Sequence, residues 1–228
     1  MNEHVTIILP AYNEERVIAD VIRALKDRGY RRIIVVDDCS KDRTNEVAKQ
    51  EGAVVLRHFL NRGVGGALGT GIQAALRFDS DIIVTFDSDG QHDPDDIPRL
   101  IEPIEKGDAD AVIGTRLSDP RGMPWSRRLA NWTANCITFA LFGVWTTDSQ
   151  SGMRAFSRAA AQKLQLMTSG MEASSEIVAE IARNRCKLKE VPITVIYTEY
   201  SLSKGQSFLR GLATLRKLLI AKVRRLNG

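Results

Sequence analysis

The feature that most constrains the fold is the alternation of short apolar runs with longer segments of helical periodicity. The run VTIILP, residues 5–10, is followed by a helical pattern over 14–27. The alternation continues, with further strands expected over 32–38, 53–58, 81–87 and 110–116, and further helices over 43–51 and 95–105. Between them, the glycine-rich segment 61–71 leads into a helix that ends near Phe78. Valine and isoleucine runs without polar alternation indicate strands buried on both faces, joined by crossover helices. The sequence therefore predicts an α/β fold with a mostly parallel sheet flanked by helices.

The second half of the chain is less regular. Its patterns predict helices over 127–142 and 174–185, a strand over 190–197, and a last helix from about residue 207. No internal repeat, low-complexity stretch or linker interrupts them. A chain of 228 residues is long enough for one domain with a proper core, and we expect one domain.

Composition excludes several classes of protein. The 32 basic and 28 acidic residues leave a net charge of +4, an excess too small to indicate a nucleic-acid partner. The cysteines Cys39, Cys136 and Cys186 are widely spaced without a CxxC pair, so we expect no disulfide framework or zinc site, and a reducing cytosol. We also expect no signal peptide and no membrane-spanning helix, since no window reaches about 18–20 uninterrupted apolar residues.

Acidic side chains follow two of the expected strands. Asp87 and Asp89 come directly after the run DIIVTF, and Gln91 follows two positions later. Carboxylate and amide oxygens suit a hard cation such as Mg²⁺ or Mn²⁺, which in turn holds phosphates. The alternative for this D-x-D pair is a solvated acidic turn.

A second carboxylate pair, Asp37 and Asp38, ends the strand expected over 32–38, in VVDDCSKDRT. Asp38 or Ser40 could simply cap the next helix. Because the carboxyl ends of parallel strands meet at one sheet edge, where ligands bind, we expect both acidic pairs there, together with Asn13 and Arg116. The segment NRGVGGALGTG leaves phosphate contact and close helix packing equally open, since it fits neither glycine-rich phosphate motif cleanly.

Taken in order, these motifs resemble family 2 glycosyltransferases of the GT-A fold. More narrowly, the chain resembles the dolichyl-phosphate mannose synthase and polyprenyl-phosphate glycosyltransferase branch. The resemblance covers essentially the whole chain and is carried by ILPAYNEE, VVDDCSKDRT, NRGVGGALGTG, FDSDGQHDPDDIP and VIGTR, and later by DSQSGMRAFS and EVPI. It implies a Rossmann-like GT-A domain over 1–228, with a nucleotide-sugar and metal-binding half (1–116), an acceptor half (117–206) and an amphipathic C-terminal helix (207–228).

The resemblance implies a donor site. It assigns nucleotide binding to Pro10, Ala11, Tyr12, Glu14, Asp38 and Asp87, with Asp38 reading the base. Asp87, Asp89 and Gln91 would hold Mg²⁺ or Mn²⁺ against the diphosphate, where the metal neutralises charge on the leaving nucleoside diphosphate. The implied reaction is inverting transfer of one sugar from a UDP- or GDP-linked donor to a dolichyl or undecaprenyl phosphate.

The acceptor decides which other residues matter. A phosphomonoester is largely ionised at neutral pH and needs cations, whereas a hydroxyl acceptor needs a general base. In the branch that the chain resembles, the arginines matching Arg116 and Arg127 bind the acceptor phosphate; with Asp89 they are the expected catalytic residues. A solvated basic helix face is the alternative for these arginines.

The chain departs from that branch at two positions. Asn131 stands where relatives carry a serine near the phosphate, and Leu202 stands where they carry an arginine, which leaves Lys204 as the nearest cation. A sugar or lipid-linked glycan hydroxyl is the alternative acceptor, with Glu176 as its base. The Q-x-x-R-W motif of processive polysaccharide synthases is absent, which argues against that group.

Two segments could reach a membrane. Trp125, Trp132 and Trp145 lie within 21 residues, close to Arg127 and Arg128, and tryptophan favours the membrane interface. The last expected helix has one apolar face and basic residues on the other. We expect peripheral association with the cytoplasmic face of a membrane, or docking onto a membrane-embedded partner; packing within the chain's own core is the alternative for both.

Two other functions fit the sequence less well. A sugar-1-phosphate nucleotidyltransferase needs a glycine-rich loop after the first strand, where this chain has PAYNEE. A dinucleotide-binding module without transferase activity also needs its glycines there, and here they follow the third strand.

Overall fold

The computed structural model describes residues 2–116, 125–170 and 172–196, and at residues 125–128, 130 and 141 it describes the backbone alone. In this part of the chain, seven strands form one sheet in the order β3-β2-β1-β4-β6-β5-β7. The strands are β1 (Val5–Ala11), β2 (Arg32–Asp37), β3 (Val54–Arg57), β4 (Ile82–Thr85), β5 (Ala111–Thr115), β6 (Arg154–Ser157) and β7 (Leu188–Pro192). All pairings are parallel except those of β6, which is antiparallel to β4 and to β5.

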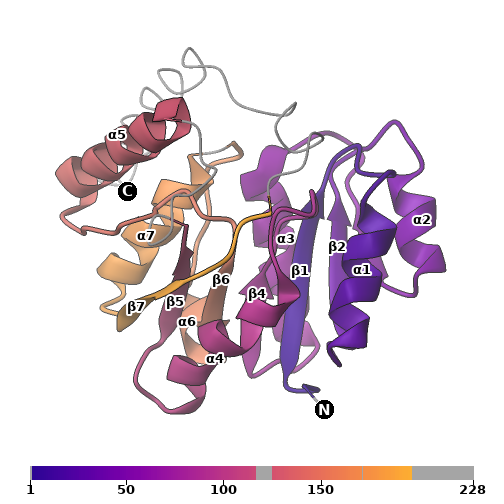
Figure 1. Ribbon diagram of the computed structural model, residues 1–228, viewed down its shortest axis with the longest axis horizontal. Coiled ribbons are helices and arrows are strands. Elements are labelled where there is room, and N and C mark those ends of the chain that lie inside the picture. Colours follow the sequence, from indigo (N-terminus) through magenta and orange to yellow (C-terminus); the bar gives the residue numbers. More distant parts are fainter. Residues whose placement is uncertain (1, 117–124, 171, 197–228) are drawn as a thin grey trace.

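Helices cover both faces of the sheet (Figure 1). They are α1 (Ile18–Asp27), α2 (Thr44–Gln50), α3 (Gly63–Arg77), α4 (Ile97–Glu105), α5 (Trp125–Phe142), α6 (Arg158–Lys163) and α7 (Ala173–Arg183), with a 3-10 turn, η1 (Pro94–Asp96), before α4. Helices α1, α2 and α4 lie on one face, and α3, α6 and α7 lie on the other. Helix α5 packs on α7. Among the described residues, no helix combines the length and apolar character that crossing a bilayer requires.

The strands bury side chains on both faces, as their continuous apolar runs predict. Ile7 and Leu9 of β1 join the apolar cluster under α1 and α4, whereas Ile8 between them joins the cluster under α3 and α7. This split follows from the two-residue period of a strand. Each of these side chains is fully buried, and burying one such side chain contributes about 1.5–3 kcal/mol to the stability of the fold.

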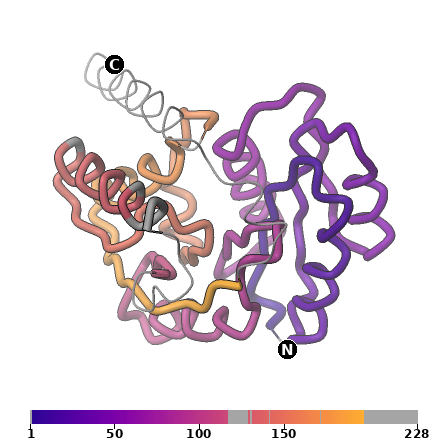
Figure 2. Tube along the Cα trace, turned by 45° about the horizontal axis from the view of Figure 1, so that its top comes forward, coloured from indigo at the N-terminus to yellow at the C-terminus, as the bar shows by residue number. Residues whose placement is uncertain are grey.

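The strand order places a ligand site at the centre of the sheet. From β1 the chain moves outward to β2 and β3, and it then crosses to β4 on the other side of β1. The loops after β1 and β4 therefore diverge, which leaves a crevice at the carboxyl ends of the two strands. Figure 2 shows that the N-terminal strands and helices lie on one side of the molecule and the chain after β5 lies on the other.

The predicted α/β fold and its first five strands are confirmed, with differences at element ends. The helix expected over 14–27 begins at Ile18, because residues 14–17 form a turn, and the strand expected at 190 begins at Leu188. The segment SGMRAFS contains an unpredicted strand, β6, between β4 and β5. Its four residues are too few for a clear pattern, and their pairing partners lie far away in sequence. The last expected helix, from about residue 207, lies outside the described residues.

Candidate active site

A cleft of about 280 Å³ opens at the carboxyl ends of β1, β2 and β4. It is lined by Pro10, Ala11, Tyr12, Glu14, Asp38, Val64, Ala67, Asp87, Ser88 and Asp89. All six residues predicted to bind the nucleotide are in this set, as are both aspartates predicted to bind the metal. Residues as far apart in sequence as Pro10 and Asp89 therefore share one cavity, at the point where the strand order switches.

Hydrogen bonds between the loops after β1 and β2 shape one wall of this cleft. The Asn13 backbone N–H donates to Ser40 Oγ at 3.0 Å, and Asn13 Oδ1 accepts from the Lys41 N–H at 2.8 Å. Asn13 adopts a left-handed conformation, with φ of 57°, which asparagine tolerates better than most residues. The Glu14 N–H donates to Thr44 Oγ1 at 2.8 Å. These contacts give Asn13, Ser40 and Thr44 a role in holding the two loops together.

Asp87 and Asp89 lie just after β4, in different electrostatic surroundings. Burial raises the pKa of Asp87, but a hydrogen bond from His92 and nearby positive charges outweigh burial and lower it overall. Burial is also the largest effect on Asp89, and the Asp87 charge adds to it, so the pKa of Asp89 is raised. The backbone N–H of Gln91 donates to Asp89 Oδ1 at 3.0 Å, and the Gln91 side-chain amide contacts Asp89 Oδ2.

A buried histidine fixes the orientation of Asp87. His92 Nε2 lies 3.0 Å from Asp87 Oδ2, and the His92 side chain is 1 % exposed. Its ring packs edge-on against Phe86, with 5.6 Å between centroids. Because an ionised carboxylate only accepts hydrogen bonds, His92 donates from Nε2. Asp87 is therefore held as an ionised, oriented oxygen donor.

The SGMR segment reaches Asp87 from the other side, because β6 is inserted next to β4. The Thr85 hydroxyl donates to the Gly152 carbonyl at 2.9 Å. A Cβ at position 152 would lie 2.1 Å from both carboxylate oxygens of Asp87, so only glycine fits there without a shift. Arg154 follows, fully buried; burial lowers the pKa of its guanidinium to about 10, while the charges of Asp87 and Asp148 oppose that effect.

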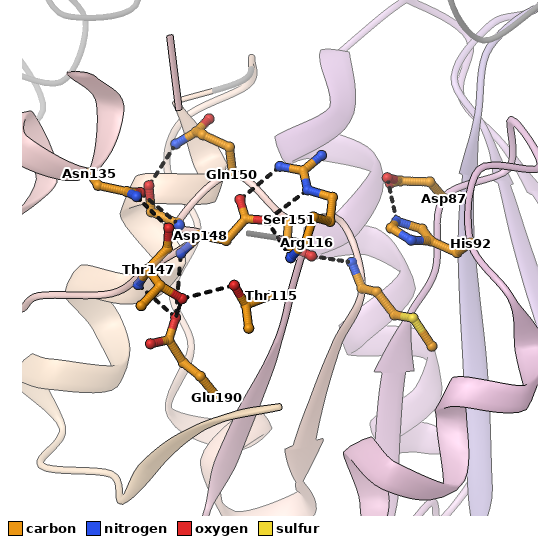
Figure 3. Close-up of polar contacts among 12 residues, drawn as sticks. Asp87, His92, Thr115, Arg116, Asn135, Thr147, Asp148, Gln150, Ser151 and Glu190 are labelled. Atoms are coloured by element: carbon orange, nitrogen blue, oxygen red, sulfur yellow. Dashed lines mark hydrogen bonds and ion pairs between the residues drawn. The ribbon is translucent and has the colours of Figure 1, made fainter. Parts of the chain in front are cut away.

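Arg116, at the end of β5, is clamped by a carboxylate that sequence reasoning did not single out. Arg116 Nε and Nη2 donate to the two oxygens of Asp148, each at 2.7 Å, and the Arg116 backbone N–H donates to Asp148 Oδ2 at 3.1 Å. Asp148 is fully buried. Figure 3 shows the Arg116 guanidinium between Asp148 and Asp87, and its charge contributes to the lowered pKa of Asp87.

The loop that carries Asp148 is itself held from two elements (Figure 3). Glu190 of β7 accepts from the Thr147 N–H at 2.8 Å. Asn135 of α5 donates to the Thr147 carbonyl at 2.6 Å and accepts from the Ser149 N–H at 2.9 Å. The orientation of Arg116 therefore depends on contacts from β5, α5 and β7 together.

The donors at Asp87 and Asp89 fit a hard divalent cation. Both carboxylates line one cleft, and the pKa of Asp89 is raised by burial and, to a lesser degree, by the Asp87 charge, two effects that a bound cation would offset. Among the described residues, no group of three or more histidine, cysteine, aspartate or glutamate side chains is arranged to bind a metal ion. Two carboxylates, the Gln91 amide and a ligand's phosphate oxygens form the oxygen set that Mg²⁺ or Mn²⁺ accepts.

The comparison with protein families decides the class. The family model described as Glycosyl transferase family 2 matches residues 6–165, which is more than half of the chain. The chain belongs to glycosyl transferase family 2. It is therefore a glycosyltransferase, and the cleft at β1, β2 and β4 is its candidate active site.

Family 2 relatives match nearly the whole chain. It is 39 % identical over 239 residues to the UDP-N-acetylglucosamine--dolichyl-phosphate N-acetylglucosaminyltransferase of Methanococcus voltae, covering 95 % of both chains. It is 46 % identical over 226 residues to Uncharacterized protein MJ1222 of Methanocaldococcus jannaschii, covering 97 % of this chain and 93 % of that one. The match to the dolichyl-phosphate transferase agrees with the polyprenyl-phosphate branch that the motifs resemble.

A solved structure confirms the GT-A fold. Glucosyl-3-phosphoglycerate synthase from Mycobacterium tuberculosis, in complex with Mn²⁺, uridine diphosphate and phosphoglyceric acid, superposes with a TM-score of 0.75. The match covers 96 % of this chain and 76 % of the other at 22 % identity. At that identity the likeness concerns the fold.

The structure describes only some of the other predicted site residues. For Arg127, on α5, the structure describes the backbone alone. Lys204 lies outside the described residues. Asn131 is partly buried on α5. Glu176 is buried on α7, where its carboxylate accepts from the Met167 N–H at 3.0 Å and the Thr168 N–H at 2.9 Å. These contacts give Glu176 a structural role in holding the 167–168 loop.

The glycine-rich segment serves packing. A Cβ at Gly65 would lie 2.2 Å from the Thr168 carbonyl oxygen, and one at Gly71 would lie 2.4 Å from Ile8 Cγ2. The Gly65 N–H also donates to the Ser169 carbonyl at 3.0 Å. Close approach of α3 to its neighbours therefore accounts for Gly65 and Gly71, while Val64 and Ala67 of the same segment line the cleft.

Sequence reasoning missed His92, Asn135 and Asp148. His92 and Asp148 are part of the motifs DSDGQHDP and DSQSGMR, and their place in these motifs is the one signal in the sequence that could have pointed to them. Their partners, Asp87 and Arg116, lie five and 32 residues away, and those pairings depend on loop geometry and on the placement of β6.

Proposed function

We propose that this glycosyltransferase moves a single sugar, with inversion, from a UDP- or GDP-linked donor to a polyprenyl phosphate. The observation that carries the proposal is the position of Arg116, a clamped cation between Asp148 and the Asp87 end of the cleft. A donor diphosphate at Asp87 and Asp89 would place its sugar next to that guanidinium. The similarity to a dolichyl-phosphate transferase over 95 % of both chains supports a lipid phosphate as the acceptor.

Asp87, Asp89 and Gln91 would hold Mg²⁺ or Mn²⁺, which supplies Lewis-acid stabilisation of the departing diphosphate. The chain's own residues do the rest of the positioning. His92 orients Asp87, and Gly152 leaves room for its carboxylate. Asp148 holds Arg116 by its Nε and Nη2 edge, so that the guanidinium charge stays beside the reacting centre. A phosphomonoester acceptor is already ionised near neutral pH, so this reaction requires no general base.

Features of helix α5 favour an enzyme that acts at a membrane surface. Leu129, Trp132 and Phe139, at 51 %, 59 % and 49 % exposure, lie on one face of the helix, and α5 contains no acidic residue. Exposed tryptophan with basic neighbours in sequence suits the interface of an anionic bilayer. In the proposed function this face rests on the membrane that contains the lipid acceptor.

The deciding experiment follows radiolabelled sugar into the organic phase. Purified protein is incubated with labelled UDP- or GDP-sugars, Mn²⁺ or Mg²⁺, and either polyprenyl phosphate or the matching polyprenol without phosphate. We expect transfer only with lipid phosphate and metal together. Asp89→Asn should abolish transfer, while Asp81→Asn, an exposed aspartate before β4, should leave it unchanged. Equal labelling of polyprenol would contradict a phosphate acceptor.

A further inference from the structure

Asp38 lies in the cleft with its carboxylate already engaged by the protein. Its Oδ1 accepts from His58 Nδ1 at 2.7 Å and from the Arg62 N–H at 2.8 Å, and its Oδ2 accepts from the Gly63 N–H at 2.6 Å. The Asp38 and His58 side chains are 5 % and 9 % exposed. Asp38 is nevertheless part of the cleft wall, next to Val64 and Ala67.

The His58 ring is held in place by a second contact, on its other nitrogen. Its Nε2 lies 2.9 Å from Thr70 Oγ1 of α3. Since Asp38 only accepts hydrogen bonds, His58 carries its proton on Nδ1, and a neutral ring accepts from Thr70 at Nε2. The chain Thr70–His58–Asp38 therefore holds Oδ1 from the side of α3.

These contacts leave Asp38 little capacity for a ligand. An ionised carboxylate has about four lone-pair positions, two on each oxygen. His58 and the Arg62 N–H take both positions on Oδ1, and the Gly63 N–H takes one on Oδ2. One acceptor position, on Oδ2, remains for a group in the cleft.

Asp38 lies where a nucleobase would be when the diphosphate is at Asp87 and Asp89. It directly follows β2, and β1 separates β2 from β4, which Asp87 follows. Two strand spacings are about 10 Å, a distance that a ribose and its first phosphate can span. This step rests on the proposed function.

We propose that His58, acting through Asp38, selects a uracil-type base and hence a uridine nucleotide donor. Uracil presents one imide N–H, which matches the single acceptor position. Guanine presents two adjacent N–H donors that require both carboxylate oxygens, so one donor would be buried without a partner. Adenine and cytosine place a ring-nitrogen acceptor beside their amine, which a carboxylate repels.

The test is calorimetric binding of UDP, GDP, ADP and CDP to the full chain with Mn²⁺. We expect UDP to bind at least about tenfold more tightly than GDP, the ratio that one unmatched hydrogen bond produces. Equal binding of UDP and GDP, or tighter GDP, would overturn the base selection while leaving the transferase proposal intact. Failure of all four to bind would instead count against the proposed nucleotide site, and the base selection would fall with it.

Variants then test the part played by His58. His58→Ala frees one position on Oδ1, so the UDP-to-GDP ratio of dissociation constants should move toward one. Thr70→Val keeps the imidazole but loosens it, and should move the ratio in the same direction by less. His4→Ala is the matched control, because His4 pairs with Glu105 at the amino end of β1. A ratio unchanged in folded His58→Ala, or in Thr70→Val should His58→Ala not fold, would overturn the role of His58.

Discussion

At the scale of single residues, Gly152 is the clearest case of a position set by a distant partner. Its missing side chain makes room for the Asp87 carboxylate, and its carbonyl accepts from Thr85. Asp87 is thereby enclosed between His92 on one side and the Gly152 backbone on the other. The glycine of SGMR is thus part of the proposed metal site although it contributes no ligand.

Gly152→Ala should therefore weaken metal-dependent binding. The added methyl displaces the Asp87 carboxylate, and disturbing the support of a ligand costs roughly 10–100-fold in metal affinity. The measurement is Mn²⁺-dependent UDP or GDP binding by calorimetry. Gly69→Ala is the control: its nearest neighbour would be 4.0 Å away, and alanine favours a helix interior, so stability should rise slightly and binding stay unchanged. Wild-type Mn²⁺ affinity in Gly152→Ala would contradict the assignment.

The Asp87–Asp89 pair should make metal-free stability depend on pH. The pKa of Asp89 is raised in the folded state, so between the ordinary aspartate pKa and that higher value the folded protein binds more protons than the unfolded chain. Stability contributed by this group therefore falls as pH rises through that window. Asp89→Asn removes a buried charge and its repulsion with Asp87, and it should raise the melting temperature in EDTA at pH 7. The difference from the wild type should shrink as pH falls through the window.

Metal should reverse that ranking. A cation that binds the folded state raises the wild-type melting temperature by mass action. Mn²⁺ should therefore stabilise the wild type and have little effect on Asp89→Asn, measured by thermal melting with and without Mn²⁺. An Asp89→Asn protein that is less stable than the wild type in EDTA at pH 7 would show that Asp89 serves the fold rather than a cation site.

At the scale of elements, the loop of residues 146–153 joins the two halves of the site. Through Asp148 it holds Arg116 at the end of β5, and through Gly152 it touches Asp87 at the end of β4. Asn135 of α5 and Glu190 of β7 hold the loop in turn. A change in the position of α5 would therefore be felt at Arg116, a link that rests on contacts between elements rather than on any one residue type.

Asp148→Asn tests this junction. It leaves the Arg116 guanidinium without its buried counter-charge, which should cost about 3 kcal/mol of unfolding free energy. Urea titration measures the change. Glu102→Gln, which removes an exposed pair with Lys106 on α4, should change stability little. Equal effects of the two substitutions would mean that the Asp148 clamp is as weak as a surface ion pair.

At the scale of the whole molecule, helix α5 lies at the same end of the molecule as the carboxyl ends of the strands (Figure 1). Phe139 on the apolar face of this helix stacks edge-on against Trp145, with 5.8 Å between ring centroids, and both are about half exposed. Aromatic side chains left open to solvent at this end of the molecule suit the membrane contact that the proposed function requires.

Phe139→Ala should reduce sedimentation with vesicles of anionic phospholipid, because it removes apolar area from the surface proposed to face the membrane. Phe78→Ala is a close control: the same side chain, 49 % exposed like Phe139, follows α3 at the amino end of β4. It should leave vesicle binding unchanged. Equal loss in both variants, or no loss in either, would count against α5 as the membrane-facing surface.

The sequence by itself determined the first five strands, their crossover helices and the sheet edge that carries the chemistry. Each of these follows from local pattern: continuous Val/Ile runs such as RIIVVD form doubly buried strands, and acidic residues placed directly after them must emerge at one edge. The cleft accordingly contains Asp38, Asp87 and Asp89, as the motifs predicted.

Only the tertiary structure decided how these groups are partnered. β6 enters the sheet antiparallel between β4 and β5, which brings Gly152 and Asp148 beside Asp87 and Arg116. Asp38, expected to read a base or cap the next helix, accepts hydrogen bonds from His58 and from the backbone N–H groups of Arg62 and Gly63 at the start of α3. These pairings join residues 20 to 65 positions apart in sequence, and their energy comes from buried hydrogen bonds and charge pairs that exist only once the sheet has assembled.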